Sequence, residues 1–526
     1  MRVQFITTAE AAALIPDHAH VVVDGFFGYS LAEEVLVELE KRYLSDRHPM
    51  GIHVKFITDP TIDGELRGIN RLAYKGMLGS AIGSNMTHSK KLGELAAENE
   101  FPIWMLPQGV ILEMWRAIAA GRPGVLTDVG LHTYADPRLE GCCMNEAAAK
   151  SDGYHVEVVK IGGEDHLFYP RFPVEYVLIK GSYADEDGNI SIEREGVRIQ
   201  QLELAMAAHN TGGKVIVQVD QLLLRNSIRP RDVTIPRDMV DYVCVGTPEH
   251  SRQQYVWSEH FLPELSGDVR IVLKSIPPMP FGVRKVLARR AAMELYKGDF
   301  TNLGIGVPTH VSDILAEEGL FDQITLSFES GIVGGLPASG FAAGSGFNAS
   351  AILRHTDMFN FIDGGGIDLT CLGCAQVDRE GNVNVTKFGG RITGPGGFVD
   401  ISQNARTVCF VGTFTAGKPD VRITPEGKLK IVSEGTLMKY VDHVDQVSFS
   451  GEYARQRGRR ILYVTERAVF EMRPEGLTLT EIAPGVDIER DIFAHMAFLP
   501  RVAEDLHLMD TRIFLDRLMG LSLKER

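Results

Sequence analysis

The sequence predicts an α/β fold made of two tandem, similarly folded domains with largely parallel sheets. Short apolar runs alternate with helical patterns, and several of these runs lack the apolar–polar alternation of a sheet with one solvated face. Such continuous apolar character is typical of strands that helices cover on both faces. Segments of the first half also recur in the same order in the second half. The expected strands are 21–23, 53–57, 177–179, 215–219, 269–272, 324–328 and 408–411, and the expected helices include 31–43, 94–99 and 283–296.

The internal repeat is clearest around two Gly-Asn turns. Gly188-Asn189 and Gly381-Asn382 each predict a hairpin turn, and an apolar strand begins at the same distance after each asparagine. Residues 22–36 and 301–315 share a second pattern, a strand followed by a glycine-rich loop and a helix. The proline-rich stretch 275–281 can continue neither a helix nor a central strand. We therefore expect domains at 1–275 and 282–526, joined by a linker at 276–281.

Length and composition exclude several classes of protein. The chain has 526 residues, 44% of them hydrophobic and 23% charged, which is ordinary for globular proteins and excludes collagen, coiled-coil arrays and wholesale disorder. The net charge of −15 argues against nucleic acid as a partner. The sequence has no apolar run of about 18 residues and no signal-peptide pattern at its start, so we expect no membrane partner and a cytoplasmic protein.

The cysteines and histidines do not form a recognisable metal or disulfide pattern. Six cysteines are too sparse for a disulfide framework in a chain of this length. Cys371 and Cys374 have redox or zinc spacing, but no second pair follows, so we interpret them as core residues. The 16 histidines show no His-x-x-x-His spacing, and we predict no metal site. The absence of Gly-x-Ser-x-Gly argues against a serine hydrolase of that type.

Glu329 is the sharpest candidate for chemistry. It ends the apolar run 324–328, and the glycine-rich segment 330–335 follows directly. Parallel sheets bind ligands beyond the carboxyl ends of their strands, and glycines leave a carboxylate there open to attack a substrate. The alternative is a glutamate that caps a helix or pairs with an arginine.

Three glycine clusters in the same half are candidates for ligand-binding loops. The first contains Gly304 and Gly306 and opens a predicted helix, whose free N–H groups bind phosphate readily. It is not a dinucleotide fingerprint, because the third glycine is missing. Each cluster taken alone is more typical of a structural turn, but together, around a glutamate at a strand end, they favour a binding site. The other clusters are Gly364, Gly365 and Gly366, and Gly394, Gly396 and Gly397.

Gln108 is a candidate in the first half. It follows the apolar run 101–106 and precedes Gly109. A glutamine amide can donate hydrogen bonds to developing negative charge. A buried amide that satisfies backbone groups is the alternative.

Across nearly its whole length the sequence resembles the family I coenzyme A-transferases, particularly the single-chain acetate/propionate type. Succinyl-CoA:3-ketoacid CoA-transferase is a more distant likeness. The segments that carry the resemblance are 68–73, 106–110, 136–141, 288–292, 302–308, 329–331, 390–402 and 465–469.

The resemblance implies a ping-pong exchange in which CoA moves from a short-chain acyl-CoA to a free carboxylic acid through a glutamyl-CoA thioester. Glu329 falls on the family's nucleophile, and Gln108 and the Gly397 N–H fall on positions associated with oxyanion stabilisation. The first domain would hold the acyl or carboxylate side. The second would hold CoA, with Gly304, Gly306, Gly364, Gly365, Gly366 and Gly396 as candidate CoA-binding residues.

The same resemblance implies a set of partners. These are acyl-CoA and small carboxylic acids, with CoA as a substrate and no cofactor or metal, and a homo-oligomer, either a dimer or a tetramer.

Two segments depart from the family pattern and concern the acyl pocket. Residues 83–87 stand where relatives carry Gly-Gly-His-Trp-Gly, and residues 25–29 form a bulkier loop than usual. Met86 and Tyr29 are the residues expected to reshape the pocket, which leads to the hypothesis of a different or larger acyl group. Three alternative functions stay open: an acyl-CoA hydrolase, a non-catalytic protein that binds CoA or a sugar phosphate, and an NAD-dependent oxidoreductase.

Overall fold

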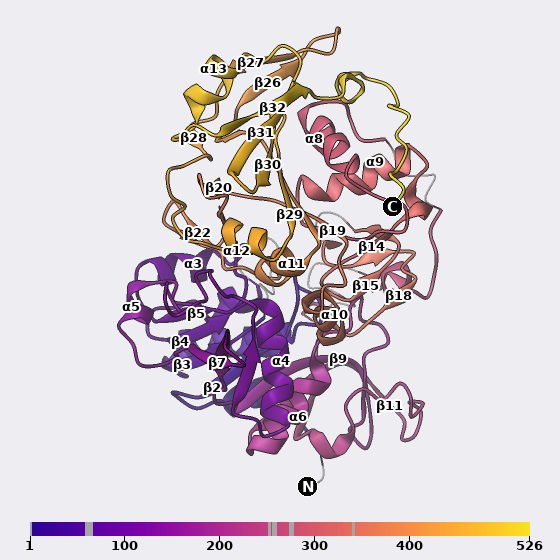
Figure 1. The fold of residues 1–526 in the computed structure, drawn as a ribbon. Helices are drawn as coiled ribbons and strands as arrows, with labels where there is room; N and C mark the ends of the chain where they lie inside the picture. The colour runs from indigo at the N-terminus through magenta and orange to yellow at the C-terminus, as the bar shows by residue number, and fades with distance from the viewer. Residues whose placement is uncertain (1–2, 58–66, 251–253, 255–259, 273–277, 339–341) are drawn as a thin grey trace.

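The computed structural model describes residues 3–57, 67–250, 254, 260–272, 278–338 and 342–526. Each half of the chain builds one large sheet with helices packed against it, and Figure 1 shows the first half below the second. Most strand pairs in both sheets are parallel. The predicted α/β fold with largely parallel sheets is therefore confirmed.

The sheet of the first half is parallel along its whole main path. Its central strand β9 is buried over most of its length, as expected for a strand covered on both faces. In spatial order the strands are β1 (Gln4–Phe5), β12 (Tyr242–Val245), β11 (Lys214–Leu223), β9 (Tyr176–Asp185), β2 (His20–Val23), β3 (Ile52–Lys55), β4 (Leu78–Gly83) and β5 (Ile103–Met105), with β10 (Ile190–Ser191) antiparallel to β9.

The sheet of the second half has a parallel centre with antiparallel pairs on both sides of it, and its last strand is parallel to the strand before it. In spatial order the strands are β18 (Ala351–Ile352), β15 (Ile332–Val333), β14 (Thr325–Ser327), β13 (Phe300–Leu303), β19 (Leu369–Leu372), β24 (Thr407–Val411), β29 (Arg460–Val464), β30 (Ala468–Arg473), β31 (Gly476–Ile482) and β32 (Arg501–Leu508).

The two sheets share one topology. The order β12-β11-β9-β2-β3 in the first sheet matches the order β29-β24-β19-β13-β14 in the second, and each set visits its five positions in the same chain order. The register agrees as well. Val177 pairs with Val215 in the first sheet, and Thr370 pairs with Val408 at the equivalent positions of the repeat in the second sheet. The structure thus contains the internal repeat that the sequence predicts.

Both Gly-Asn turns form hairpins with the same hydrogen bonds. Asp185 accepts the N–H groups of Asp187 and Asn189 and the Asn189 side-chain amide, at 2.9–3.0 Å. Asp378 accepts the equivalent groups of Glu380 and Asn382 at 3.0–3.1 Å. The first turn joins β9 to β10, and the second joins β20 to β21.

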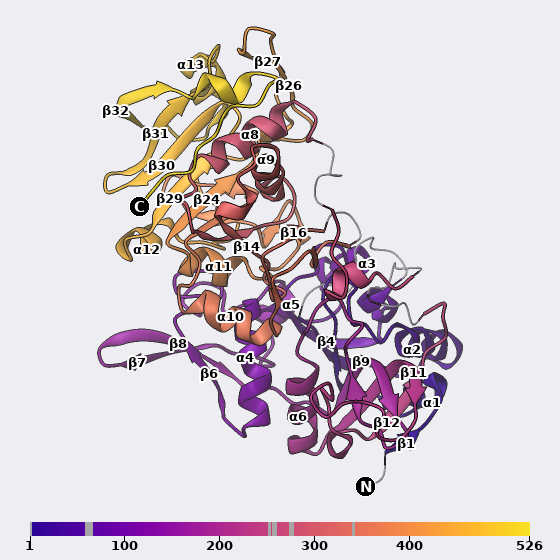
Figure 2. The same cartoon turned by 90° about the vertical axis from the view of Figure 1, so that its right-hand side faces the viewer.

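Helices cover the sheets, and smaller ribbons complete the fold. The helices are α1 (Thr8–Ala13), α2 (Glu33–Asp46), α3 (Lys90–Ala97), α4 (Gln108–Ala119), α5 (Glu146–Ala149), α6 (Gln201–Thr211), α7 (Pro263–Ser266), α8 (Val283–Ala292), α9 (Val311–Glu317), α10 (His355–Asp363), α11 (Phe398–Asn404), α12 (Gly451–Gln456) and α13 (Ile488–Asp491). An antiparallel ribbon of β6 (Gly124–Thr127), β8 (Glu164–Pro170) and β7 (Glu157–Ile161) extends from the body in Figure 2. The short pairs are β16 (Leu336–Pro337) with β17 (Gly346–Phe347), β20 (Gln376–Val377) with β21 (Val383–Asn384), β22 (Lys387–Phe388) with β23 (Arg391–Ile392), β25 (Thr415–Ala416) with β28 (Leu437–Met438), and β26 (Asp420–Ile423) with β27 (Leu429–Ser433).

The two halves meet through α4, which packs on α6 of its own half and on α10 and α11 of the other. Arg116 on α4 donates to Thr356 and Asp357 at the start of α10, each at 2.6 Å. The core is correspondingly continuous, because one cluster of buried apolar side chains includes residues of both halves.

Three sequence predictions need correction. Residues 269–272 are not in a strand, because Asn348 binds the backbone N–H and carbonyl of Ile271 in place of a neighbouring strand. The helix expected at 94–99 begins earlier, at Lys90, and the helix expected to reach residue 296 ends at Ala292. The linker at 276–281 lies partly outside the described residues, so the domain boundary stays a prediction.

No helix in the part of the chain that the structure describes is long and apolar enough to cross a membrane.

Candidate active site

Glu329 lies where β14 ends, in the tight turn that leads to β15. The Gly331 N–H donates to the Phe328 carbonyl at 3.0 Å and closes the turn. Gly331 has a φ of +106°, and a Cβ there would lie 2.2 Å from the Leu353 carbonyl oxygen. The glycine after the strand is therefore required by backbone conformation and by close packing, and the turn presents Glu329 at the carboxyl end of a parallel strand.

Glu329 opens onto a cavity of about 350 Å³ between the two halves. The first half contributes two phenylalanines of the 25–30 loop and a polar segment after β4. The second half contributes the glycine-rich loops. The lining residues are Phe26, Phe27, Asn85, Thr87, His88, Asn302, Leu303, Gly304, Ile305, Phe328, Glu329, Ser330, Gly344, Leu372, Gly373, Val385, Gly394, Pro395, Gly396, Gly397, Phe398 and Ile401.

Gly397 packs directly against the Glu329 carboxylate. A Cβ at Gly397 would lie 2.3 Å from Oε2 of Glu329, so a larger residue would displace the carboxylate. Gly397 immediately precedes α11. The loop before it is tied to the first half, because Gly396 exchanges hydrogen bonds with Ser84 at 3.0 and 3.2 Å. The loop is therefore held close to Glu329 from both sides.

Gln108 reaches the same carboxylate from the first half. It is fully buried at the start of α4, its backbone N–H donates to the Gly396 carbonyl at 3.2 Å, and its side chain hydrogen-bonds Glu329. The side-chain Nε2 also lies 2.9 Å from Nε2 of His355. The structure thus brings Glu329, Gln108 and Gly397 together, although they are far apart in the sequence.

Burial dominates the electrostatics of this site. It raises the pKa of Glu329 to about 7, and the hydrogen bond from Gln108 offsets only part of the rise. Behind Gln108, Asp400 accepts the Gly109 N–H at 3.0 Å, and burial together with the charge of Asp363 raises the pKa of Asp400 well above its usual range. Burial likewise raises the pKa of Asp363 to about 8. A carboxylate with a pKa near neutrality is at once available as a nucleophile and desolvated.

The glycines predicted to bind CoA divide into two groups. Gly304 and Gly396 line the cavity, and Gly306 lies on the exposed part of the same loop as Gly304. Gly364, Gly365 and Gly366 do not line it. They form the turn at the C-terminal end of α10, where their N–H groups donate to carbonyls of residues 360–362. A helix-ending turn accounts for these three glycines without a ligand.

The aromatic side chains of the 25–30 loop also divide into those that line the cavity and one that does not. The Tyr29 hydroxyl donates to the Ala342 carbonyl at 2.6 Å, and neither Tyr29 nor Met86 is among the lining residues. Phe26 and Phe27 line the cavity instead. The loop does line the cavity, but through different residues from those expected.

Sequence reasoning missed the residues that support Gln108, namely His355, Gln200, Asp24 and Asp400. No local motif marks them, and they approach Gln108 only after the chain has folded.

Within the described ranges, no group of three or more His, Cys, Asp and Glu side chains could hold a metal ion. Cys371 is buried in β19 and Cys374 is partly exposed, both as free thiols.

Comparison with known proteins gives full-length relatives. The family model described as "Coenzyme A transferase" matches residues 5–246. The chain is 43% identical to a caffeate CoA-transferase from Acetobacterium woodii over 523 residues, 98% of each chain. It is 37% identical to the acetate CoA-transferase YdiF of Escherichia coli K12 over 527 residues, which cover 100% of this chain and 97% of the relative.

A solved structure agrees with the sequence comparison. The structure of YdiF from E. coli O157:H7 as a thioester complex with CoA superposes with a TM-score of 0.92 at 35% identity, covering 100% of this chain and 98% of that one.

Proposed function

The chain belongs to the coenzyme A-transferase family, and from that premise we propose that Glu329 is the residue that carries CoA during transfer. The enzyme moves CoA from an acyl-CoA to a free carboxylic acid through a thioester intermediate. One observation carries the assignment to Glu329: a desolvated carboxylate with a pKa of about 7 lines the cavity between the halves, against Gly397 and hydrogen-bonded by Gln108.

In the first half-reaction, the Glu329 carboxylate attacks the thioester carbonyl carbon. A C–O bond forms, the C–S bond breaks, and the products are a mixed anhydride and the CoA thiolate. The thiolate then attacks the Glu329 carbonyl, which forms the glutamyl thioester and releases the first acid. The second acid attacks this thioester, and the released thiolate returns to the new acyl group and regenerates the Glu329 carboxylate. No proton is gained or lost, so the chemistry calls on neither a metal nor an organic cofactor.

Gln108 and the Gly397 N–H are proposed to stabilise the oxyanions of these steps. Both lie beside Glu329, where negative charge develops on the attacked carbonyl oxygen. Oriented donors in a water-poor site stabilise such charge strongly, and loss of one costs about a hundred- to thousand-fold in rate. Enclosure also protects the anhydride and thioester from hydrolysis. Gly304, Gly306 and Gly396 remain the proposed contacts for CoA, because their loops reach the cavity or its rim.

Intact-protein mass spectrometry after incubation with an acyl-CoA, without acceptor acid, tests the assignment. We expect a CoA-sized adduct that maps to Glu329 and disappears in Glu329→Ala. Glu475→Ala, at an exposed glutamate between β30 and β31, is the matched control and should keep the adduct. An adduct that persists in Glu329→Ala would overturn the assignment. Steady release of free CoA without acceptor would instead indicate a hydrolase.

We further propose an acyl group larger than acetate or propionate. Phe26 and Phe27 line the cavity with apolar rings that suit an extended apolar or aromatic acid, and the caffeate CoA-transferase named above is consistent with this. Comparison of kcat/KM over short, branched, hydroxylated and aromatic acids tests the proposal. A clear optimum at acetate or propionate would refute it.

A further inference from the structure

A chain of buried polar side chains leads away from Gln108 through His355. Nε2 of Gln108 lies 2.9 Å from Nε2 of His355, and Nδ1 of His355 lies 3.2 Å from Oε1 of Gln200. Nε2 of Gln200 in turn donates to Oδ1 of Asp24. All four residues are at most 1% exposed. The chain crosses the junction of the halves, because only His355 comes from the second half.

With the two glutamine amides oriented as they are in the structure, the donors and acceptors of this chain run in one direction. An amide nitrogen can only donate, so Nε2 of His355 must accept from Gln108, and the ring proton must be on Nδ1. That proton is donated to the side-chain carbonyl oxygen of Gln200. The side-chain NH2 group of Gln200 then donates to Asp24. In these amide orientations the imidazole is the Nδ1–H tautomer.

The surroundings keep His355 neutral and its ring in place. Burial lowers the pKa of His355 to about 3, so Nε2 remains an acceptor at neutral pH. The ring packs edge-to-face against Phe26 at 4.9 Å and against Phe359 at 5.3 Å between centroids. The backbone N–H of His355 donates to the backbone carbonyl of Arg198 at 2.8 Å, which ties the start of α10 to the first half. Burial also raises the pKa of Asp24 to about 8, so the end of the chain is largely uncharged at pH 7.

The orientation of the Gln108 amide determines which of its atoms faces Glu329. With Nε2 held by His355, the second amide N–H remains for the Glu329 carboxylate. In this orientation Oε1 has no hydrogen-bond partner among the described residues. Rotation of the amide by 180° would place that carbonyl oxygen, rather than an N–H, toward the negative charge. The acceptor Nε2 of His355 thus keeps the Gln108 N–H directed at the reaction centre.

We propose that His355 is a positioning residue for CoA transfer, supported by Gln200 and Asp24, that holds the Gln108 amide with its N–H toward the oxyanion. The inference rests on the proposed function, in which Gln108 stabilises that oxyanion. Hydrogen bonds in a dry interior polarise one another, so each member of the chain strengthens the donor at its end. His355 itself touches no reacting atom.

His355→Phe removes both ring nitrogens and keeps an aromatic ring against Phe26 and Phe359. We expect kcat of CoA exchange to fall about ten- to hundred-fold, because a misplaced donor costs up to about a hundred-fold. KM for the acyl-CoA should change less than about two-fold. The decisive measurement repeats the substitution in Gln108→Ala, where no amide remains to be oriented. There we expect no further loss, whereas equal losses in both backgrounds would overturn the proposal.

A pair of partial mimics tests the direction of the chain even if His355→Phe folds poorly. The amide of His355→Gln reaches the position of Nε2 and can still accept from Gln108, whereas the amide of His355→Asn reaches only that of Nδ1. We expect His355→Gln to retain at least about five-fold more kcat than His355→Asn, in line with the cost of a misplaced donor. Equal kcat values would refute the positioning role. Failure of the proposed function is distinguishable, because the wild-type enzyme would then form no adduct at Glu329.

Discussion

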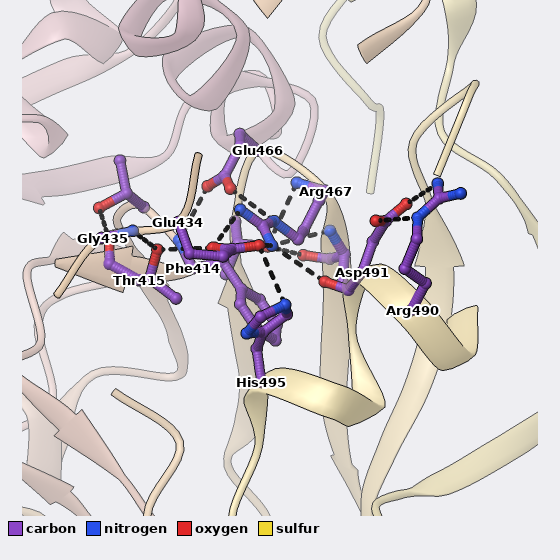
Figure 3. A network of polar contacts seen from close by, with 12 residues as sticks. Phe414, Thr415, Glu434, Gly435, Glu466, Arg467, Arg490, Asp491 and His495 are labelled. Carbon is purple, nitrogen blue, oxygen red and sulfur yellow. Dashed lines mark hydrogen bonds and ion pairs between the residues drawn. The ribbon is translucent and has the colours of Figure 1, made fainter. Parts of the chain in front are cut away.

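Partly buried carboxylates in this enzyme have opposite environments in two regions of the second half. At the active site, Glu329 interacts with the neutral amide of Gln108, and burial raises its pKa. Around Arg467, at the far end of the second sheet, the acids are paired with a cation (Figure 3). Arg467 is fully buried, lies 2.8 Å from Glu466 and 2.6 Å from Glu434, and stacks 4.8 Å from the centre of the Phe414 ring.

The pKa values follow from this difference. Burial by itself would raise the pKa of Glu434, but the hydrogen bond and charge of Arg467 outweigh it, and the pKa is lowered. Glu434 therefore stays ionised and contributes to stability, whereas Glu329 is costly to ionise and correspondingly reactive. The comparison separates these acids by their partners: the acid beside an arginine has a lowered pKa, whereas the acid beside an amide and a glycine has the raised pKa of the nucleophile that we propose.

Removal of the Arg467 guanidinium should destabilise the folded protein. Arg467→Met leaves Glu466 and Glu434 without their buried partner, and we expect the free energy of unfolding to fall by about 3–5 kcal/mol. Urea denaturation measures the loss. Arg422→Met is the matched control, because Arg422 forms an exposed pair with Asp420, and its loss should leave the free energy of unfolding nearly unchanged. Similar losses for the two variants would contradict the comparison.

Removal of the uncompensated charge of Glu329 should stabilise the folded protein. The pKa of Glu329 is raised in the folded protein from 4.5 to about 7, so ionisation destabilises the fold as pH rises through this window. The full cost applies above pH 7 and amounts to about 3 kcal/mol. Glu329→Gln should therefore be more stable than wild type by up to this amount at pH 8, with no difference near pH 4.

Glu434→Gln provides the contrast for that measurement. Its pKa is lowered, so the ionised side chain stabilises the fold at neutral pH, and that contribution is lost as pH falls. The substitution should destabilise the protein at pH 8. If thermal denaturation at pH 8 showed both glutamate variants to be destabilised, the distinction between the two regions would be wrong.

Local pattern was sufficient to predict most of the strands and the position of Glu329 at the end of one of them. Apolar runs such as 215–219 and 408–411 are strands because both faces are covered, and Glu329 is recognisable because a strand end and a glycine-rich turn are adjacent in sequence. Residues 269–272 have equally β-branched composition but hydrogen-bond a side chain, which local composition does not reveal. The same limit applies to the 364–366 glycines, since a helix-ending turn and a ligand loop have the same composition.

The support behind Gln108 could not be predicted for a different reason. Asp24 and Gln200 meet within the first half, but His355 joins them only when α10 packs on α4, so the complete chain is a property of the junction between the halves. Which of the aromatic residues at 26–29 face the cavity likewise depends on the path of a loop whose Phe27 and Ser30 have positive φ. Sequence spacing alone does not determine such directions.

The smallest predicted effect concerns the rate at which Glu329 reacts. Only the ionised carboxylate attacks the thioester, and with a pKa of about 7 its population falls tenfold for each pH unit below that value. The second-order rate constant of adduct formation without acceptor acid should therefore be about tenfold lower at pH 6 than its plateau above pH 8. Quenched-flow mass spectrometry measures this constant directly. A rate constant that is flat from pH 5 to pH 8 would mean that Glu329 is ionised throughout, as a paired acid like Glu434 would be, and the two regions would then not differ in the way that the structure indicates.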